Sequence, residues 1–339
     1  MSNNLSTLFT LCMLCGASGY ENEVTQFITK KLDEENIEYT VDKIGNIVVR
    51  QGDNPDNLGI FAHTDEVAFG VKAITDEGMI KFEAIGGILE NILPSHAVMI
   101  GEEKIKGVIG NIPPHLKKKS KDKSLSYNDF FIDIGAKSKE DAKKYVKIGD
   151  PIYWISKYTE FGDNLIKAKA LDDRAGVSIL LSLVLSKKYS FTAVFTTREE
   201  LGVIGAKTVL KSNKDINLKN ALVLEVTTCA DMPEVTEKTT VLGNGVAISV
   251  MDRGSVSDKD FNEEIIKIAK KNKIKVQKKL TLAGGNDANA ITYFGGGIPT
   301  TVLSLPGRYI HSPVTVISKD DYFEMQKLCQ KILEERISK

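Results

Sequence analysis

Hydrophobic and polar positions follow two different rhythms along this chain. In residues 21–35 the apolar side chains recur three or four positions apart, and short, nearly continuous apolar runs come soon after. Apolar residues three or four positions apart indicate a helix with one buried face, and short continuous apolar runs are typical of buried strands. We therefore expect a helix over 21–35 and strands over 37–41, 46–50 and 59–62.

The same alternation returns after residue 167. Apolar strands that alternate with helices form a mostly parallel sheet with helices on its faces. The fold class is accordingly α/β. The expected helices are 171–185, 202–211, 260–271 and a last helix from Ser318, and the expected strands are 191–195, 221–226 and 300–303.

Between these two parts, residues 66–165 show a different pattern. Short apolar runs follow one another, separated by turn signals such as Gly86-Gly87. Closely spaced short strands predict a small β module. The simplest organisation is one α/β domain made of residues 1–65 and 166–339, interrupted by a β domain at 66–165. Its expected strands are 71–75, 79–83, 97–100, 105–109 and 130–134.

Composition narrows the class of protein. The chain has 339 residues, of which 42% are hydrophobic and 27% charged, as in ordinary globular proteins. Lysine plus arginine and aspartate plus glutamate each number 45, so the formal net charge is zero. A duplex nucleic-acid binder usually carries a basic excess, so we expect no nucleic-acid partner. The basic run at 117–123 has no interleaved aromatic residue, and we interpret it as a solvated loop.

The four cysteines are too few and too scattered for a secreted disulfide framework. Cys12 and Cys15 have a spacing that suits redox chemistry or half a metal site, but no second such pair follows, so we interpret them as buried apolar residues. No apolar run approaches the roughly 18 residues of a membrane span, so we expect no membrane partner. No basic residue precedes the apolar stretch from Leu5 to Cys15, and we expect a cytoplasmic protein without a targeting segment.

Polar residues with metal-binding chemistry stand where predicted strands and helices begin or end. His63 and Asp65 follow one strand, Glu199 and Glu200 follow another, and Asp172 opens a helix. Ligands of open α/β sheets bind outside the carboxyl ends of the strands. These groups are therefore expected to lie in one crevice.

Two more candidates complete the set. Glu225 lies inside an otherwise apolar strand, where a buried carboxylate must be paired or bind a metal. His311 follows the last predicted strand. Taken singly, each histidine fits a structural role, Asp172 fits a helix N-cap, and Glu199 and Glu200 fit a solvent-facing turn. Taken together, imidazole and carboxylate groups suit a dinuclear site for zinc, cobalt or manganese.

The remaining reactive residues receive structural interpretations. His96 and His115 lie in the β module, away from the candidate set. Ser312 stands beside His311, but a serine-hydrolase nucleophile of this kind needs a Gly-x-Ser-x-Gly elbow, and the chain contains none.

The order and spacing of several motifs are distinctive. They are Gly16-Ala-Ser-Gly-Tyr-Glu21, Ala62-His-Thr-Asp-Glu-Val67, Gly107-Val-Ile-Gly110, Ile132-Asp-Ile-Gly135, Ala168-Lys-Ala-Leu-Asp-Asp-Arg174, Glu199-Glu-Leu-Gly202, Gly284-Gly-Asn-Asp287 and Arg308-Tyr-Ile-His-Ser-Pro313. In these motifs, and over nearly its whole length, the chain resembles the M42 family of metallo-aminopeptidases, which includes the tetrahedral TET aminopeptidases and the bacterial glutamyl aminopeptidases. The resemblance implies a dinuclear zinc-peptidase fold with an inserted PDZ-like dimerisation domain.

The resemblance also implies two divalent metal ions per subunit, most readily zinc or cobalt, with manganese as a further option. One ion would be held by His63, Asp172 and Glu225. The other would be held by Asp172, Glu200 and His311, so that Asp172 bridges the two.

The reaction implied by the resemblance is the removal of N-terminal residues from peptides. Glu199 matches the family's general acid/base: it would take a proton from a water shared by the metals and deliver it to the leaving amine. Asp65 matches the carboxylate behind the histidine ligand, where it fixes the imidazole tautomer. Asp173 would help to shape the backbone after the bridging aspartate. The family also implies a homo-oligomer built from dimers, up to a hollow tetrahedral dodecamer that admits peptides.

The chain departs from the family pattern at a few positions. Glu225 stands where aspartate is common, Asn286 and Asn289 stand where threonine and glycine are usual, and Val246 replaces a proline. Acidic, basic and aliphatic N-terminal specificities share this scaffold, so the preferred residue stays open. The alternatives are a metal-dependent deacylase or carboxypeptidase on the same core, an endoglucanase, as some members have been labelled, and a non-catalytic assembly protein.

Overall fold

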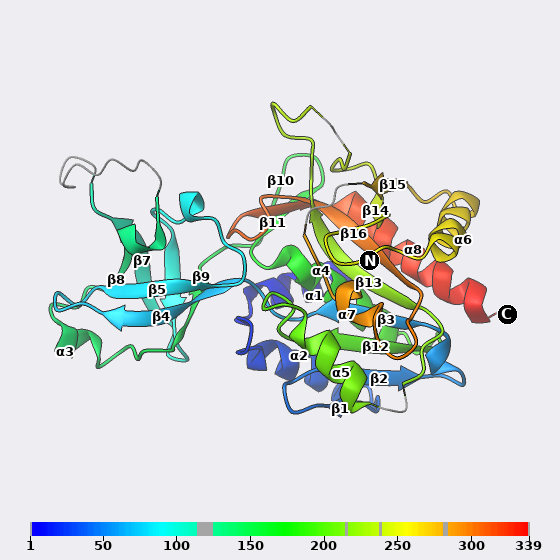
Figure 1. The fold of residues 1–339 in the computed structure, drawn as a ribbon, viewed down its shortest axis with the longest axis horizontal. Helices are drawn as coiled ribbons and strands as arrows, with labels where there is room; N and C mark the ends of the chain where they lie inside the picture. The colour runs from blue at the N-terminus through cyan, green and yellow to red at the C-terminus, as the bar shows by residue number, and fades with distance from the viewer. Residues whose placement is uncertain (1, 114–124, 214–215, 237–238, 281–283, 338–339) are drawn as a thin grey trace.

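The computed structural model describes residues 2–113, 125–213, 216–236, 239–280 and 284–337. It has two parts, a large β-sheet flanked by helices and a small closed β-barrel at one side of it (Figure 1). His115 and the basic run at 117–123 lie outside the described residues.

Four parallel strands form the centre of the large sheet, and all four were predicted from the sequence. They are buried along almost their whole length, which explains why their sequences are nearly continuous apolar runs. In order across the sheet they are β12 (Phe191–Thr196), β3 (Gly59–His63), β13 (Ala221–Thr228) and β16 (Thr300–Arg308).

The strands around this centre make the sheet mixed, which corrects the prediction of a mostly parallel sheet. Apart from the parallel β14–β15 pair, they run antiparallel to their neighbours. Most have two to four residues, too few to show a periodic pattern, and only β1 and β2 were predicted. They are β1 (Thr40–Val41), β2 (Ile47–Gln51), β10 (Thr159–Phe161), β11 (Leu165–Ala168), β14 (Val246–Ser249), β15 (Val276–Lys279) and β17 (Thr315–Ser318).

Helices pack on both faces of the sheet. The five predicted helices begin within two residues of their expected starts, and the four with an expected end also end within two residues of it. The larger apolar core includes α1 (Ser2–Met13), α2 (Asn22–Glu34), α4 (Leu171–Leu185), α6 (Lys259–Lys271) and α8 (Lys319–Ile337). A smaller core on the other face includes α5 (Ile204–Ser212) and α7 (Ala288–Ile291). Cys12 and Cys15 are buried and unpaired, in agreement with their interpretation as apolar residues.

The barrel has its own apolar core, which includes Phe69, Phe130 and Trp154. The ring of His96 packs edge-on against Trp154 with centroids 5.4 Å apart, which agrees with a structural role for this histidine. A short helix, α3 (Lys139–Ala142), precedes the last barrel strand. The strands are β4 (Ala68–Ile74), β5 (Ile80–Ile85), β6 (Ala97–Ile100), β7 (Ile105–Asn111), β8 (Phe130–Asp133) and β9 (Pro151–Trp154), closed in the order β4-β5-β8-β7-β6-β9.

None of the helices within the described ranges combines the length and the apolar character that crossing a bilayer requires.

Candidate functional site

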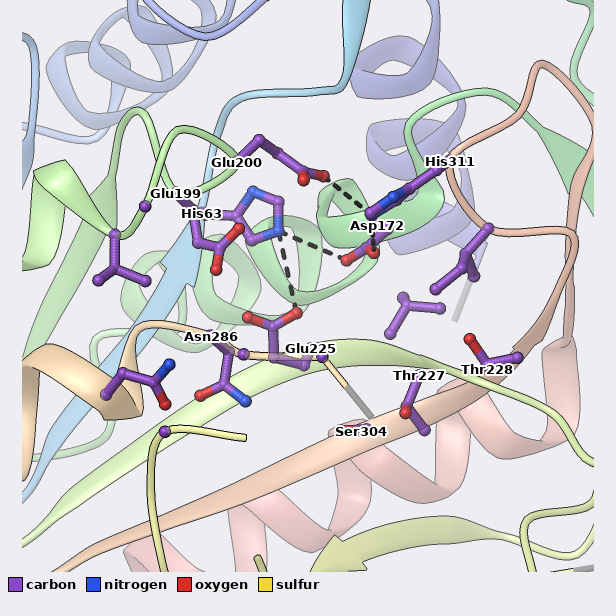
Figure 2. Close-up of a pocket in the computed structure, with 18 of the residues that line it drawn as sticks. His63, Asp172, Glu199, Glu200, Glu225, Thr227, Thr228, Asn286, Ser304 and His311 are labelled. Atoms are coloured by element: carbon purple, nitrogen blue, oxygen red, sulfur yellow. Dashed lines mark ion pairs between the residues drawn. The ribbon is translucent and has the colours of Figure 1, made fainter. Parts of the chain in front are cut away.

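Side chains from separate elements converge beside the parallel strands (Figure 2). Each follows a strand, opens a helix or projects from a strand, as expected for the ligand-binding edge of an open α/β sheet. They are His63 at the end of β3, Asp172 at the start of α4, Glu199 and Glu200 after β12, Glu225 within β13, and His311 after β16.

His63, Asp172 and Glu225 form one group of potential ligands. Nε2 of His63 lies 3.4 Å from Oδ1 of Asp172 and 3.9 Å from Oε2 of Glu225. All three residues are at least nine-tenths buried. Oδ1 of Asp172 and Oε1 of Glu225 make no hydrogen bond within the described structure. Buried carboxylate oxygens without partners are unfavourable, and a bound cation would relieve that cost.

Asp172 also belongs to a second group, with Glu200 and His311. Nε2 of His311 lies 3.6 Å from Oδ2 of Asp172 and 3.3 Å from Oε1 of Glu200. The other ring nitrogen of His311, Nδ1, lies 2.7 Å from the carbonyl oxygen of Gly87. When Nδ1 carries the hydrogen and donates it to Gly87, Nε2 is left as an acceptor that faces the two carboxylates. The contribution of Gly87 was not predicted, because the sequence indicated only a turn there.

The cluster has an excess of negative charge. Burial raises the pKa of Glu225 and of Glu199 well above their ordinary values, and neighbouring carboxylates add to both shifts. For His63, burial lowers the pKa, but contacts with Asp172 and Asp65 outweigh burial and raise it. Cations are therefore favoured here. The imidazole and carboxylate donors fit zinc, cobalt or manganese.

A third combination of potential ligands, His63 with Glu199 and Glu200, was not anticipated. Glu199 therefore lies close enough to the first group to exchange protons with a molecule held there. The peptide bond between Asp172 and Asp173 is cis, and Oδ1 of Asp173 accepts the N–H of Gly176 at 2.9 Å.

A buried carboxylate supports the turn that carries Glu199 and Glu200. Oδ1 of Asp65 accepts the N–H of Glu199 at 2.9 Å, and Oδ2 accepts the N–H of Glu200 at 3.1 Å. Ser18 donates its hydroxyl hydrogen to Oδ2 of Asp65 at 2.5 Å. Oδ1 of Asp65 also lies 3.4 Å from Nδ1 of His63. One carboxylate thus connects His63 to the backbone of both glutamates.

Glu21 supports the residue before this pair. Its Oε1 accepts the N–H of Arg198 at 3.0 Å and that of Gly19 at 2.8 Å. Arg198 has a φ of 55°, in the left-handed region that is unfavourable for residues other than glycine. The hydrogen bond that the Arg198 N–H donates to Glu21 offsets part of that cost. Sequence reasoning assigned Glu21 no role, and no local pattern was able to show it, because its partner lies 177 positions along the chain.

The cluster opens into a cavity of about 570 Å³, a size usual for small-ligand sites. Neutral polar residues such as Thr227, Asn286 and Ser304 line it close to the cluster (Figure 2). Two lysines, Lys207 and Lys279, line it as well.

Comparison with known proteins finds a matching family, curated relatives and solved structures that are similar to this chain. The model of the M42 glutamyl aminopeptidase family matches residues 45–328. A relative from Acetivibrio thermocellus, named as a candidate aminopeptidase, is 35% identical over 322 residues, which cover 93% of this chain and 94% of that protein.

Two solved structures resemble the whole chain. A TET aminopeptidase from a marine sediment archaeon of the Thaumarchaeota has a TM-score of 0.92 at 30% identity and covers 98% of this chain and 96% of its own. The TET1 peptidase of Pyrococcus horikoshii, described as able to assemble into a tetrahedron or a large octahedral shell, has a TM-score of 0.86 at 30% identity. That match covers 97% of this chain and 99% of the other.

Proposed function

The chain belongs to the M42 family of aminopeptidases, and from this premise we propose that it removes N-terminal residues from peptides at a dinuclear metal centre. The observation that carries the proposal is the pair of three-residue groups that share Asp172. Together they offer ligands for two ions, beside a further carboxylate, Glu199, that neither group requires.

We assign one ion to His63, Asp172 and Glu225, and the other to Asp172, Glu200 and His311. The support for this assignment is the burial of the first group and its unbonded carboxylate oxygens. Two divalent ions, zinc or cobalt or else manganese, would polarise the scissile carbonyl and lower the pKa of water in the site.

Glu199 is assigned the proton transfers. Its carboxylate lies beside His63 in the wall of the cavity. One Glu199 oxygen would take the proton of the attacking water and then return it to the amine that leaves, as a general base followed by a general acid. This role requires that the Glu199 carboxylate point towards the attacking water. The hydrogen bond from the Glu199 backbone N–H to Asp65 fixes the turn from which that side chain extends.

Asp65 and Glu21 are positioning residues in this scheme. Asp65 faces Nδ1 of His63, so that Nε2 is directed towards Asp172 and Glu225. A carboxylate at this place orients the imidazole and raises its basicity.

Hydrolysis of free and blocked substrates tests the proposed function. Glutamyl, lysyl, alanyl and leucyl p-nitroanilides would be compared with their N-acetylated forms, after chelation and after zinc, cobalt or manganese is restored. We expect metal-dependent cleavage of the free forms only. Release of acetate from the acetylated forms would favour the deacylase alternative, and activity that survives chelation would contradict the metal centre.

We further propose that the chain forms homo-oligomers built on dimers, with residues 66–165 as the dimerisation domain. Support comes from the assembly named for the similar Pyrococcus structure and from exposed apolar side chains of the barrel region, such as Val108 and Ile148, which are 50% and 71% exposed. Light scattering of the purified protein should give a multiple of 37.3 kDa, up to a dodecamer, and a monomer mass would refute the proposal. A cytoplasmic location stays a prediction.

A further inference from the structure

The wall of the cavity contains a buried lysine without a partner. Lys279, the last residue of β15, is 6% exposed and is one of the lining residues. Among the described residues, no carboxylate lies within ion-pair distance of its ammonium group, and its side chain makes no hydrogen bond. The ammonium nitrogen is not one of the fully buried atoms, so it keeps contact with the cavity, and an ion pair formed there would gain from the largely desolvated surroundings. An anion that enters the cavity would supply that partner.

The sheet register places this lysine on the same face as the metal-binding groups. The side chains of one row across β13, β16, β14 and β15 belong to Glu225, Ser304, Ala247 and Gln277. Lys279 lies two residues beyond Gln277, and residues two apart on a strand share a face. At a strand spacing of about 4.8 Å, three steps separate the Cα atoms of Glu225 and Lys279 by about 14 Å or more. The side chain of one substrate residue fits between the cluster and the lysine.

The other residues of the cavity wall do not compete for that anion. Apart from Lys207, Lys279 and the residues of the cluster, the described lining residues are uncharged. Lys207 is exposed, and its Nζ donates a hydrogen bond to the carbonyl oxygen of Gly202 at 2.9 Å. The cavity is thus negative at the metal cluster and positive beyond it. A basic substrate side chain would meet a like charge there, and an apolar side chain would leave the ammonium unpaired.

We propose that Lys279 pairs with the side-chain carboxylate of an N-terminal glutamate or aspartate, so that the enzyme prefers peptides with acidic N-termini. This inference rests on the proposed aminopeptidase function. It assigns Lys279 to specificity, because the lysine contacts the substrate side chain and not the bond that is cleaved.

The test compares kcat/KM for glutamyl, glutaminyl, leucyl and lysyl p-nitroanilides. Glutamine matches glutamate in shape and lacks only the charge, so their ratio isolates the ion pair. We expect the glutamyl substrate to be preferred over the glutaminyl one by about 30-fold or more, the range for a buried charge pair. Lys279→Met should abolish that preference, chiefly by raising KM for the glutamyl substrate. Lys279→Glu should favour the lysyl substrate.

Lys278→Met is the matched control. Lys278 is the preceding residue of β15, is exposed, and points to the opposite face, so its replacement should leave all four substrates unchanged. The wild-type ratio is informative even if a Lys279 variant fails to fold.

Two outcomes would overturn the proposal while leaving the aminopeptidase function intact. One is equal cleavage of glutamyl and glutaminyl substrates by the wild type. The other is a Lys279→Met variant that keeps the wild-type ratio but loses activity on a dipeptide relative to its C-terminal amide. In that case Lys279 binds the peptide's terminal carboxylate, which anilides lack. Failure to cleave any free aminoacyl anilide would instead contradict the proposed function.

Discussion

Replacing Asp65 by asparagine is expected to loosen the turn that carries Glu199 and Glu200. Asparagine has nearly the same shape, but only one of its two terminal atoms accepts hydrogen bonds. If its oxygen keeps the bond from the Glu199 N–H, its amide group faces the N–H of Glu200, donor against donor. The buried N–H of Glu200 then has no partner, and the remaining hydrogen bonds to residue 65 are weaker because their acceptor is no longer charged.

The size of the effect follows from these contacts. One unsatisfied buried donor, together with weakened bonds to Ser18 and Glu199, costs about 2–4 kcal/mol. With an unfolding entropy of about 2.1 cal/mol/K per residue, the chain of 339 residues has about 0.7 kcal/mol/K. The melting temperature of Asp65→Asn should therefore fall by about 3–6 °C. Zinc affinity should fall about 10–100-fold, because Asp65 also orients His63.

Circular dichroism melts of chelator-treated protein, with zinc titrations of the same samples, measure both quantities. Ser18→Ala is the control, because it removes one of the bonds to Asp65 and leaves both backbone bonds in place. It should lower the melting temperature by less than Asp65→Asn and leave zinc affinity unchanged. An Asp65→Asn variant with wild-type melting and wild-type zinc affinity would refute the positioning role of Asp65.

Three further changes test other parts of the account. Glu199→Gln should lower kcat about 10²–10⁴-fold with metal content unchanged, and loss of metal on elemental analysis would show that Glu199 is a ligand instead. Burial raises the pKa of Glu21 from 4.5 to about 7, so the folded chain keeps a proton that the unfolded chain releases, and stability should fall by about 3 kcal/mol as pH rises through that window. Glu21→Gln retains the oxygen that accepts both N–H bonds and should make that slope smaller in melts taken between pH 4.5 and 7, where Asp287 and other buried carboxyl groups also contribute; an unchanged slope would contradict the assignment. Lys169 donates to the buried Glu66 at 2.7 Å, and Lys169→Met should cost up to about 3–5 kcal/mol in urea unfolding, because Arg174 at 3.6 Å then remains as the cation beside that carboxylate. Adding Glu66→Gln should recover part of the loss, and a single variant as stable as the wild type would contradict the importance of the pair.

The predictable part of the fold consists of elements with long, uniform patterns. The central strands β3, β12, β13 and β16 are apolar runs, and α2 and α4 begin where their sequence patterns begin. β15 was missed because it has four residues, of which Val276 and Gln277 are half-buried and Lys278 is exposed. Its position comes from pairing with β14, a contact that no local pattern encodes. Lys279 was therefore not recognisable as a cavity residue.

The candidate site was predictable for a different reason. His63, Asp172 and Glu225 carry groups that their local sequence does not accommodate easily, such as a carboxylate within an apolar strand, and they stand at positions where α/β sheets bind ligands. The supporting residues lack such a signal. Gly87 acts through its backbone carbonyl and Glu21 acts on a backbone N–H far along the chain, so only the folded structure reveals them.

The central claim is that two groups sharing Asp172 hold two metal ions. The most direct measurement is anomalous X-ray scattering, above and below the zinc edge, from crystals of the zinc-loaded protein. The account predicts two peaks per chain, about 3.5–4 Å apart. One peak should contact His63 and Glu225, the other Glu200 and His311, and both should contact Asp172. A single peak, or two peaks that do not share Asp172, would contradict it.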